Sequence, residues 1–197
     1  MNDIEGLARE VECYITPEWA VDAILDVELM TDNILDPCCG TGVLARVAMD
    51  HGYRFILSID KYDWGYGDGN MDFLDDPYEV DEDKNRTPLT VLMNPPFSKA
   101  TQFVEKAFAI GARKIICFQR FAWWESEKRT EFWRQYPPNR IYVCAARATC
   151  WRVDLTPEQI NKMGNTTTAH AWFVWEKGHP PGPLVSRLSK KKGQTDG

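Results

Sequence analysis

The stretch "NILDPCCGTGVLARVAMDHG", residues 33–52, decides the fold class of this sequence. Its apolar residues run to Asp36 and stop at Pro37, which lacks the N–H group that a strand ladder needs. Gly40 and Gly42 then allow a tight turn, and the run that follows them indicates a helix. The stretch therefore predicts a strand, a glycine-rich turn and a helix, with the turn opening onto the helix N-terminus.

The same alternation continues along the chain. Further strands are expected at 54–60, 89–93, 113–119, 139–146 and 170–176, and helices at 17–30, 99–111 and 124–136. Residues 61–88 are rich in Gly, Asp, Asn and Pro, which predicts loops and one short strand. Strands alternating with helices predict an α/β fold of the Rossmann-like type: a doubly wound, mainly parallel sheet of about seven strands with helices on both faces. Ligands of such folds bind at the carboxyl ends of the strands.

Length and composition indicate one soluble domain over residues 1–197. We expect flexible ends at 1–12 and 178–197, a frayed tail from Lys177 onward, and an inserted loop at 149–168. The first ten residues are acidic and polar, unlike a signal peptide. The six cysteines form no C-x-x-C pair and the chain has three histidines, which argues against a zinc site and favours reduced cysteines in a cytoplasm.

The charge is distributed unevenly along the chain. Residues 1–110 carry 8 Lys and Arg against 22 Asp and Glu, whereas residues 111–152 carry 9 against 3. The net charge of −6 alone argues against a nucleic-acid partner. The basic stretch allows two interpretations, a mixed solvated surface or a contact with an anionic partner.

The glycine turn predicts a cofactor site. No Gly-Lys-Ser/Thr follows it, so it is no phosphate loop, and it lacks the full G-x-G-x-x-G pattern. The next strand ends in Asp60, about 20 residues beyond the turn, where an acid suits ribose hydroxyls. An adenosine-type cofactor fits the combination of the glycine turn and Asp60. Asp72 could accept a hydrogen bond from an adenine amine while Phe73 packs on the ring, although an acidic loop is the simpler interpretation.

The strand at 89–93 ends in "NPPF", Asn94 to Phe97. This ending is either a stiff turn or a rigid grip for chemistry. Asn94 offers an acceptor oxygen, and Pro95 and Pro96 have no N–H, so we expect their carbonyls to face outward unpaired. A planar amine could donate one hydrogen to Asn94 and another to the Pro95 carbonyl, which would aim its lone pair at an electrophile while Phe97 stacks on the attached ring.

Together, "DPCCGTG" and "NPPF" resemble the motifs of S-adenosylmethionine-dependent DNA methyltransferases that modify adenine N6, in particular small phage-type enzymes. "YITPEW", residues 14–19, and the later segments of the chain extend the resemblance from about residue 12 to residue 180. It implies a class I methyltransferase fold and S-adenosylmethionine as the cofactor. It also implies that Asn94, Pro95, Pro96 and Phe97 hold the target base, and that the cofactor is held by Tyr14, Thr16, Asp36, Pro37, Gly40, Gly42, Asp60, Asp72 and Phe73.

The resemblance further implies DNA as the partner of the basic region 113–152, in the cytoplasm of a bacterial or phage-infected cell. Seven basic residues are expected on the target side of the sheet: Arg120, Lys128, Arg129, Arg134, Arg140, Arg147 and Arg152. The family usually carries a separate target-recognition domain, for which this chain has no room. Residues 149–168 or 121–140 could replace it. Adenine in RNA, a glutamine side chain in protein and a non-catalytic binding subunit are the alternatives.

Overall fold

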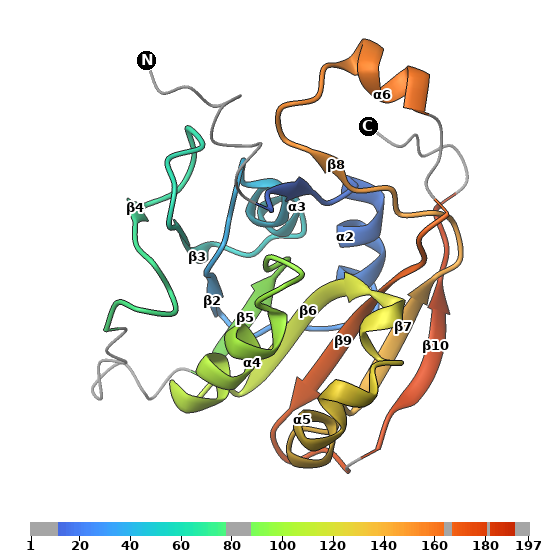
Figure 1. Ribbon diagram of the computed structural model, residues 1–197. Helices are drawn as coiled ribbons and strands as arrows, with labels where there is room; N and C mark the ends of the chain where they lie inside the picture. Colours follow the sequence, from blue (N-terminus) through green and yellow to red (C-terminus); the bar gives the residue numbers. More distant parts are fainter. Residues whose placement is uncertain (1–11, 78–87, 164–166, 181, 192–197) are drawn as a thin grey trace.

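The computed structural model describes residues 12–77, 88–163, 167–180 and 182–191. An eight-stranded sheet with the order β10-β7-β9-β6-β5-β2-β3-β4 forms its centre (Figure 1). The strands are β2 (Asn33–Asp36), β3 (Phe55–Asp60), β4 (Gly69–Asn70), β5 (Leu89–Met93), β6 (Lys114–Arg120), β7 (Arg140–Cys144), β9 (His170–Glu176) and β10 (Leu184–Leu188). Among them β9 alone runs antiparallel to its neighbours, so the predicted mainly parallel α/β sheet is confirmed.

Helices and a small second sheet surround this centre. The helices are α2 (Glu18–Leu25), α3 (Val43–Asp50), α4 (Ala100–Ala109), α5 (Thr130–Gln135) and α6 (Pro157–Met163), with short 3-10 helices η2 (Phe121–Trp123) and η3 (Glu127–Arg129). The second sheet pairs β1 (Tyr14–Ile15) with β8 (Trp151–Arg152) in antiparallel fashion. No helix within the described ranges is both long and apolar enough to cross a membrane.

Both faces of the sheet are buried under helices. Alternate residues of a strand point to opposite faces. Leu92 and Ile116 pack in one cluster with α2 and α3. Their neighbours Val91 and Ile115 pack in a second cluster with Phe103 of α4 and other apolar side chains. The two clusters give the sheet its doubly wound, three-layer character, as the near-continuous apolar strands predict.

The chain order creates a switch point beside β2. From β2 the chain adds β3 and then β4 on one side, and β5 returns to pair with the other side of β2. The carboxyl ends of β2 and β5 are therefore adjacent. These are the ends that carry the glycine turn and the NPPF tetrapeptide. A doubly wound fold binds its ligands at this point.

The last strand corrects the expectation of a frayed C-terminal tail. Residues 184–188 form β10, which pairs parallel with β7 from Leu184↔Arg140 to Leu188↔Cys144 and makes the sheet one strand larger than expected. Leu188 is 4% exposed and packs in the core, which holds the strand in place. Of the expected flexible ends at 1–12 and 178–197, residues 1–11, 181 and 192–197 lie outside the described residues.

Two expected helices are shorter than the sequence predicts. The first ends at Leu25 because Glu28 turns inward to a buried ion-pair cluster. The second, expected at 124–136, is helical only from Thr130 to Gln135, after two 3-10 turns. A continuous helix would separate Trp124 and Trp133 by about 13 Å. Their ring centroids are 4.6 Å apart, so the chain folds back to bring both rings together.

A buried cluster of charges joins α2 to the amino edge of the sheet. Glu28, 4% exposed, accepts hydrogen bonds from Lys114 (2.8 Å), Tyr142 (2.8 Å) and the Arg140 guanidinium (2.9 Å to Nη2). Arg140 also pairs with Glu176. Burial opposes ionisation of Glu28, but the hydrogen bonds from Arg140, Lys114 and Tyr142 hold its pKa below the ordinary value. The carboxylate therefore stays charged and satisfied inside the protein.

Replacing Glu28 by Ala should lower the free energy of unfolding by about 3–5 kcal/mol, because it leaves the buried Lys114 and the partly buried Arg140 with Glu176 as their one remaining carboxylate partner among the described residues. Urea unfolding followed by circular dichroism measures this change. Glu131→Ala is the control, since the Glu131–Arg134 pair is more than two-thirds exposed and should contribute under about 1 kcal/mol. Equal losses in the two variants would contradict the assignment.

Candidate active site

Asn94 lies directly after β5, and its side-chain amide is held by the N-terminal segment. Nδ2 donates to the Tyr14 carbonyl at 3.1 Å and to Thr16 Oγ1 at 2.8 Å. A carbonyl oxygen can only accept, so this contact fixes which end of the amide is the nitrogen. Oδ1 receives no hydrogen bond from the described residues. The arrangement leaves one oriented acceptor at the strand tip, as the sequence predicts.

The proline carbonyls correct the expected geometry. Both were expected to face outward unpaired, but the Pro95 carbonyl accepts from Gln119 Nε2 at 3.1 Å and the Pro96 carbonyl accepts from the Lys99 N–H at 2.9 Å. Gln119 reaches Pro95 because β6 pairs beside β5. A carbonyl has two lone pairs, so Pro95 keeps one further acceptor position while Gln119 fixes its orientation.

Aromatic and cationic groups surround Phe97. Its ring stacks on Tyr14 with centroids 5.3 Å apart, and the Arg120 guanidinium carbon lies 4.3 Å from its centroid. His170 lies 6.1 Å away, stacked in turn on Phe118. Burial, and secondarily the charge of Arg120, lower the pKa of His170 to about 4, so its imidazole is neutral at physiological pH.

Asp60 organises the glycine turn. Its Oδ2 accepts from the Gly40 N–H at 2.9 Å, and its Oδ1 accepts from the Tyr62 N–H and the Trp64 indole. Burial raises the pKa of this carboxyl. The spacing of about 20 residues between the turn and the acid therefore has a structural purpose as well as the predicted cofactor one. Oδ2 still has acceptor capacity for a ligand hydroxyl.

The cofactor role expected of Gly42 stays a prediction, and the packing of the protein itself also requires a glycine there. Its φ is +81°, and a Cβ there would lie 2.4 Å from the ring of Tyr66, so a side chain would strain the backbone and collide with that ring. The close approach at Gly42 is to Tyr66. At Gly40, where φ is +51°, a Cβ would lie 3.4 Å from Cys13 Sγ and would have no other neighbour within 4 Å among the described residues.

A cavity of about 310 Å³ lies between the glycine turn, the NPPF motif and the N-terminal segment. Of the residues predicted to hold a cofactor, it is lined by Tyr14, Thr16, Pro37, Gly40, Asp60, Asp72 and Phe73. Asp36 and Gly42 lie outside its wall. Aromatic side chains of Trp64, Phe73 and Phe103 also line it. Aromatic walls suit a purine and the carboxylate of Asp60 suits hydroxyl donors, so the residues fit an adenosine-type ligand.

Asp36 lies behind this wall at the end of β2. It is 1% exposed, and its Oδ2 has no hydrogen-bond partner within the described part of the chain. Burial, and secondarily the nearby Asp60, raise the pKa of Asp36 to about 8.

Asp72 and Phe73 reach the wall but already have protein partners. Asp72 pairs with Lys61 at 2.8 Å and accepts from the Leu74 N–H at 3.0 Å, which lowers its pKa against the opposing effect of burial. Phe73 is 1% exposed and packs on Phe103 at 5.5 Å. Their contact with an adenine stays a prediction.

A second cavity of about 350 Å³ lies on the other side of Tyr14. Phe97, Arg120 and His170 line it, as do Trp151, Arg152 and Leu155 of the segment between β7 and β9. The β1–β8 pairing brings that segment beside Tyr14. The expected inserted loop at 149–168 therefore contributes to the wall of this cavity, next to the NPPF motif.

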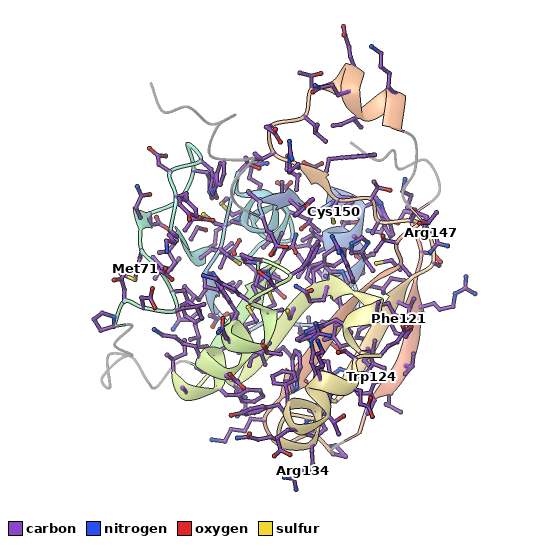
Figure 2. All side chains as sticks on the ribbon, in the orientation of Figure 1. Met71, Phe121, Trp124, Arg134, Arg147 and Cys150 are labelled. Atoms are coloured by element: carbon purple, nitrogen blue, oxygen red, sulfur yellow. The ribbon has the colours of Figure 1, made fainter. Side chains whose placement is uncertain are left out.

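The basic region is not gathered on one side as expected. Arg140 begins β7 at the opposite edge of the sheet and is bound in the cluster around Glu28. Arg134 pairs with Glu131 on α5, and Figure 2 shows it far from Cys150 and Arg147. Arg152 pairs with Asp154. The expectation of a single basic face on the target side is wrong at least for Arg134 and Arg140.

Sequence reasoning missed three residues of the site. Glu12 accepts from both the N–H and the hydroxyl of Ser98, at 3.0 and 2.7 Å, and so holds the turn after Phe97. Gln119 and His170 lie on β6 and β9. None of the three belongs to a motif, and each reaches the site through pairing between distant segments. The polar residue in the otherwise apolar run "IICFQR" was the one available signal for Gln119.

Comparisons with known proteins bear on the fold alone. No protein-family model matches the sequence, and no curated protein matches it. Among solved structures, a Pyrococcus horikoshii protein assigned as an RNA methyltransferase is similar with a TM-score of 0.54 and 15% identity, over 90% of this chain and 99% of that one. An Agrobacterium tumefaciens protein predicted to be an O-methyltransferase has a TM-score of 0.53 and 12% identity, over 91% and 90%.

The 23S rRNA methyltransferase ErmE is similar with a TM-score of 0.50 and 11% identity, over 81% of this chain and 68% of that one. Identities this low relate the chains by fold and by nothing finer. Together with the sheet order, they give this protein the Rossmann-like fold of class I methyltransferases.

The raised pKa of Asp36 predicts a pH-dependent stability. The folded protein keeps the Asp36 proton up to about pH 8, whereas the unfolded chain loses it near the ordinary value of 3.8. Rising pH therefore favours unfolding between these two values. Asp36→Asn removes this contribution, so the stability of the variant relative to wild type should increase from about pH 4 to about pH 8 and then level off. Urea unfolding at pH 5, 7 and 8.5 measures it.

Asp32→Asn, at an exposed position just before β2, serves as the matched control and should leave the pH dependence unchanged. Parallel pH curves for wild type and Asp36→Asn would contradict the assignment.

Proposed function

We propose that this protein transfers a methyl group from S-adenosylmethionine to the exocyclic N6 amine of adenine in DNA. The observation that carries the proposal is the held amide of Asn94. Its nitrogen is bound by Tyr14 and Thr16, so its oxygen is an oriented acceptor in a motif that borders two cavities. The fold likeness supports methyl transfer in general, and the resemblance of "DPCCGTG" and "NPPF" to adenine methyltransferases supports adenine N6 as the target.

The first cavity would hold the cofactor. Asp60 would accept hydrogen bonds from ribose hydroxyls, and Trp64, Phe73 and Phe103 would pack against the adenine. The open backbone at Gly40 would leave room for the methionine part between the turn and Tyr14. When bound, S-adenosylmethionine would supply the methyl group in electrophilic form.

The second cavity would hold the target base. Asn94 lines the first cavity and Phe97 the second, so the amine would lie at the boundary between the two. There Asn94 Oδ1 would accept one hydrogen of the amine, and the remaining lone pair of the Pro95 carbonyl would accept the other. Two acceptors at the strand tip orient the amine and stabilise the positive charge that develops on its nitrogen. The base would stack on Phe97. An amine paired inside a duplex is out of reach, so the target would be flipped out of the helix.

DNA would approach from the carboxyl edge of the sheet. Arg120, the last residue of β6, and Arg147, which follows β7, are exposed at this edge. Five residues of the segment 149–168 line the second cavity, namely Cys150, Trp151, Arg152, Leu155 and Thr168, and the segment would replace a separate recognition domain. Figure 1 shows α6 projecting beyond the carboxyl ends of β5 and β6. The side chains of Glu158, Gln159 and Lys162 on α6 are exposed, and they form a surface available for DNA.

The tetrapeptide is tested by Asn94→Ala and Phe97→Ala. Loss of an oriented acceptor should lower the methylation rate by about 100-fold or more. Loss of the stacking ring should weaken target binding by about 1–3 kcal/mol. Transfer of labelled methyl from S-adenosylmethionine to DNA measures both. Phe97→Ala should bind the cofactor as wild type does, since Phe97 does not line the first cavity.

Thr16→Val is the matched control for Asn94. It removes one of the two contacts of the amide nitrogen but keeps Oδ1, and should reduce the rate far less than Asn94→Ala. Full activity of Asn94→Ala would refute the mechanism. Label found in RNA or protein, with none in DNA, would support one of the alternative substrates instead.

The recognition segment is tested by replacing residues 156–163 with a Gly/Ser linker. The exposed helix α6 contributes little to the core, so the free energy of unfolding should change by about 1 kcal/mol or less. Cofactor binding should remain and the sequence preference of methylation should be lost. Expression in methylation-free cells, followed by sequencing that maps modified adenines, measures this. An unchanged methylation pattern would exclude α6 from recognition.

A further inference from the structure

Arg120 occupies the position at which a target ring would stack. Its guanidinium carbon lies 4.3 Å from the centroid of Phe97, and both residues line the second cavity. The other face-to-face neighbour of Phe97 is Tyr14, at 5.3 Å. A base entering this cavity needs a free face of the Phe97 ring, and the guanidinium covers one. Arg120 and the base therefore compete for the same surface.

Arg120 is also held less firmly than Arg134, Arg140 and Arg152. It ends β6, whose six preceding residues are buried, and its own side chain is exposed. Arg134, Arg140 and Arg152 each form an ion pair with a carboxylate. Arg120 forms none with any residue that the structure describes. The contact with the Phe97 ring is thus the interaction that positions the guanidinium. No ion pair with a described residue prevents the Arg120 side chain from turning away from that ring.

We propose that Arg120 is a gate on the target-base site. In the free protein it stacks on Phe97, and on binding it yields this face to the flipped adenine and turns to a phosphate of the same strand. This inference rests on the proposed function, because it assumes that Phe97 receives the base. A planar guanidinium can stack on an aromatic ring and can also bind phosphate, which an ammonium group does only as a point charge.

The exchange is favourable by the ordinary strengths of the two interactions. An exposed cation–π contact corresponds to a factor of about two to five in an equilibrium constant. Stacking of a base on an aromatic side chain corresponds to a factor of about five to more than one hundred. The base should therefore displace Arg120, while the guanidinium still keeps the site closed to weaker ligands. Binding of the displaced guanidinium to a phosphate adds to the preference for the open state.

The test compares wild type with Arg120→Lys and Arg120→Met. Free adenine is titrated in the presence of saturating S-adenosylhomocysteine, which fills the first cavity, and binding is followed by saturation-transfer NMR. Arg120→Met should bind adenine about two- to fivefold more tightly, because it leaves no cation over the ring. Arg120→Lys should show a smaller gain, because an ammonium group can still lie over the ring but does not cover it as a planar guanidinium does. In the background of Phe97→Leu this increase should disappear. Equal adenine affinity in wild type and both variants would overturn the gate.

A second titration separates the gate from a simple phosphate contact. Binding of a single-stranded oligodeoxyadenylate is measured against salt concentration. Arg120→Lys should keep the wild-type salt dependence, and Arg120→Met should lose about 0.7 of a unit of slope, as expected for one phosphate contact on a single strand. An unchanged slope in Arg120→Met would overturn the transfer to phosphate.

The outcome can be distinguished from failure of the proposed function. If the wild-type protein methylates DNA and all three proteins bind adenine equally well, the gate is rejected and the proposed function is retained. Tighter adenine binding in both variants without any methylation of DNA would support the gate and reject the function.

Discussion

The hydrogen bonds of the Asn94 amide are the interaction on which the site depends. Two acceptors of the N-terminal segment, the Tyr14 carbonyl and Thr16 Oγ1, take both N–H donors of one side chain. That contact orients the oxygen of Asn94 and ties the segment to the tip of β5. The same segment pairs through β1 with β8, and its Glu12 holds the turn after Phe97. One amide thus joins three parts of the chain that are distant in sequence, and each of them contributes to a cavity wall.

Tyr14 divides the space above the sheet into two compartments. It lines both cavities, and its ring packs on Phe97. The first compartment is lined by three carboxylates (Glu12, Asp60 and Asp72) and two lysines (Lys61 and Lys99), whereas the charged residues in the wall of the second are Arg120 and Arg152. This division follows the charge division of the sequence, because acidic residues dominate the half that builds the first compartment. A cationic ligand on one side and an anionic polymer on the other would each meet charges of opposite sign.

The sequence predicts those parts of the site that are local in the chain. Asn94 follows β5 and Asp60 ends β3, and both positions could be assigned because a strand and its end are read from consecutive residues. Gln119 and His170 could not be found this way, since the pairing of β5, β6 and β9 brings them to the motif. Gly42 is a third case. The glycine pattern can be recognised in the sequence, but the close contact that requires a glycine there is with the ring of Tyr66, 24 residues away. The prediction of a continuous helix at 124–136 was wrong because the tertiary packing of Trp124 on Trp133 outweighs the helical pattern of the sequence.

The two edges of the sheet differ in whether their buried polar groups have hydrogen-bond partners. At the amino edge, Glu28 is surrounded by donors that satisfy its carboxylate. At the carboxyl edge, Asp36 Oδ2 and His170 Nδ1 are buried without a hydrogen-bond partner in the described chain. An unsatisfied buried polar atom costs about 1–3 kcal/mol, so it persists only where the rest of the fold supplies that stability. The amino edge and the apolar layers do so here. The two unsatisfied atoms therefore lie beside the candidate site, Asp36 behind the wall of the first cavity and His170 in the wall of the second.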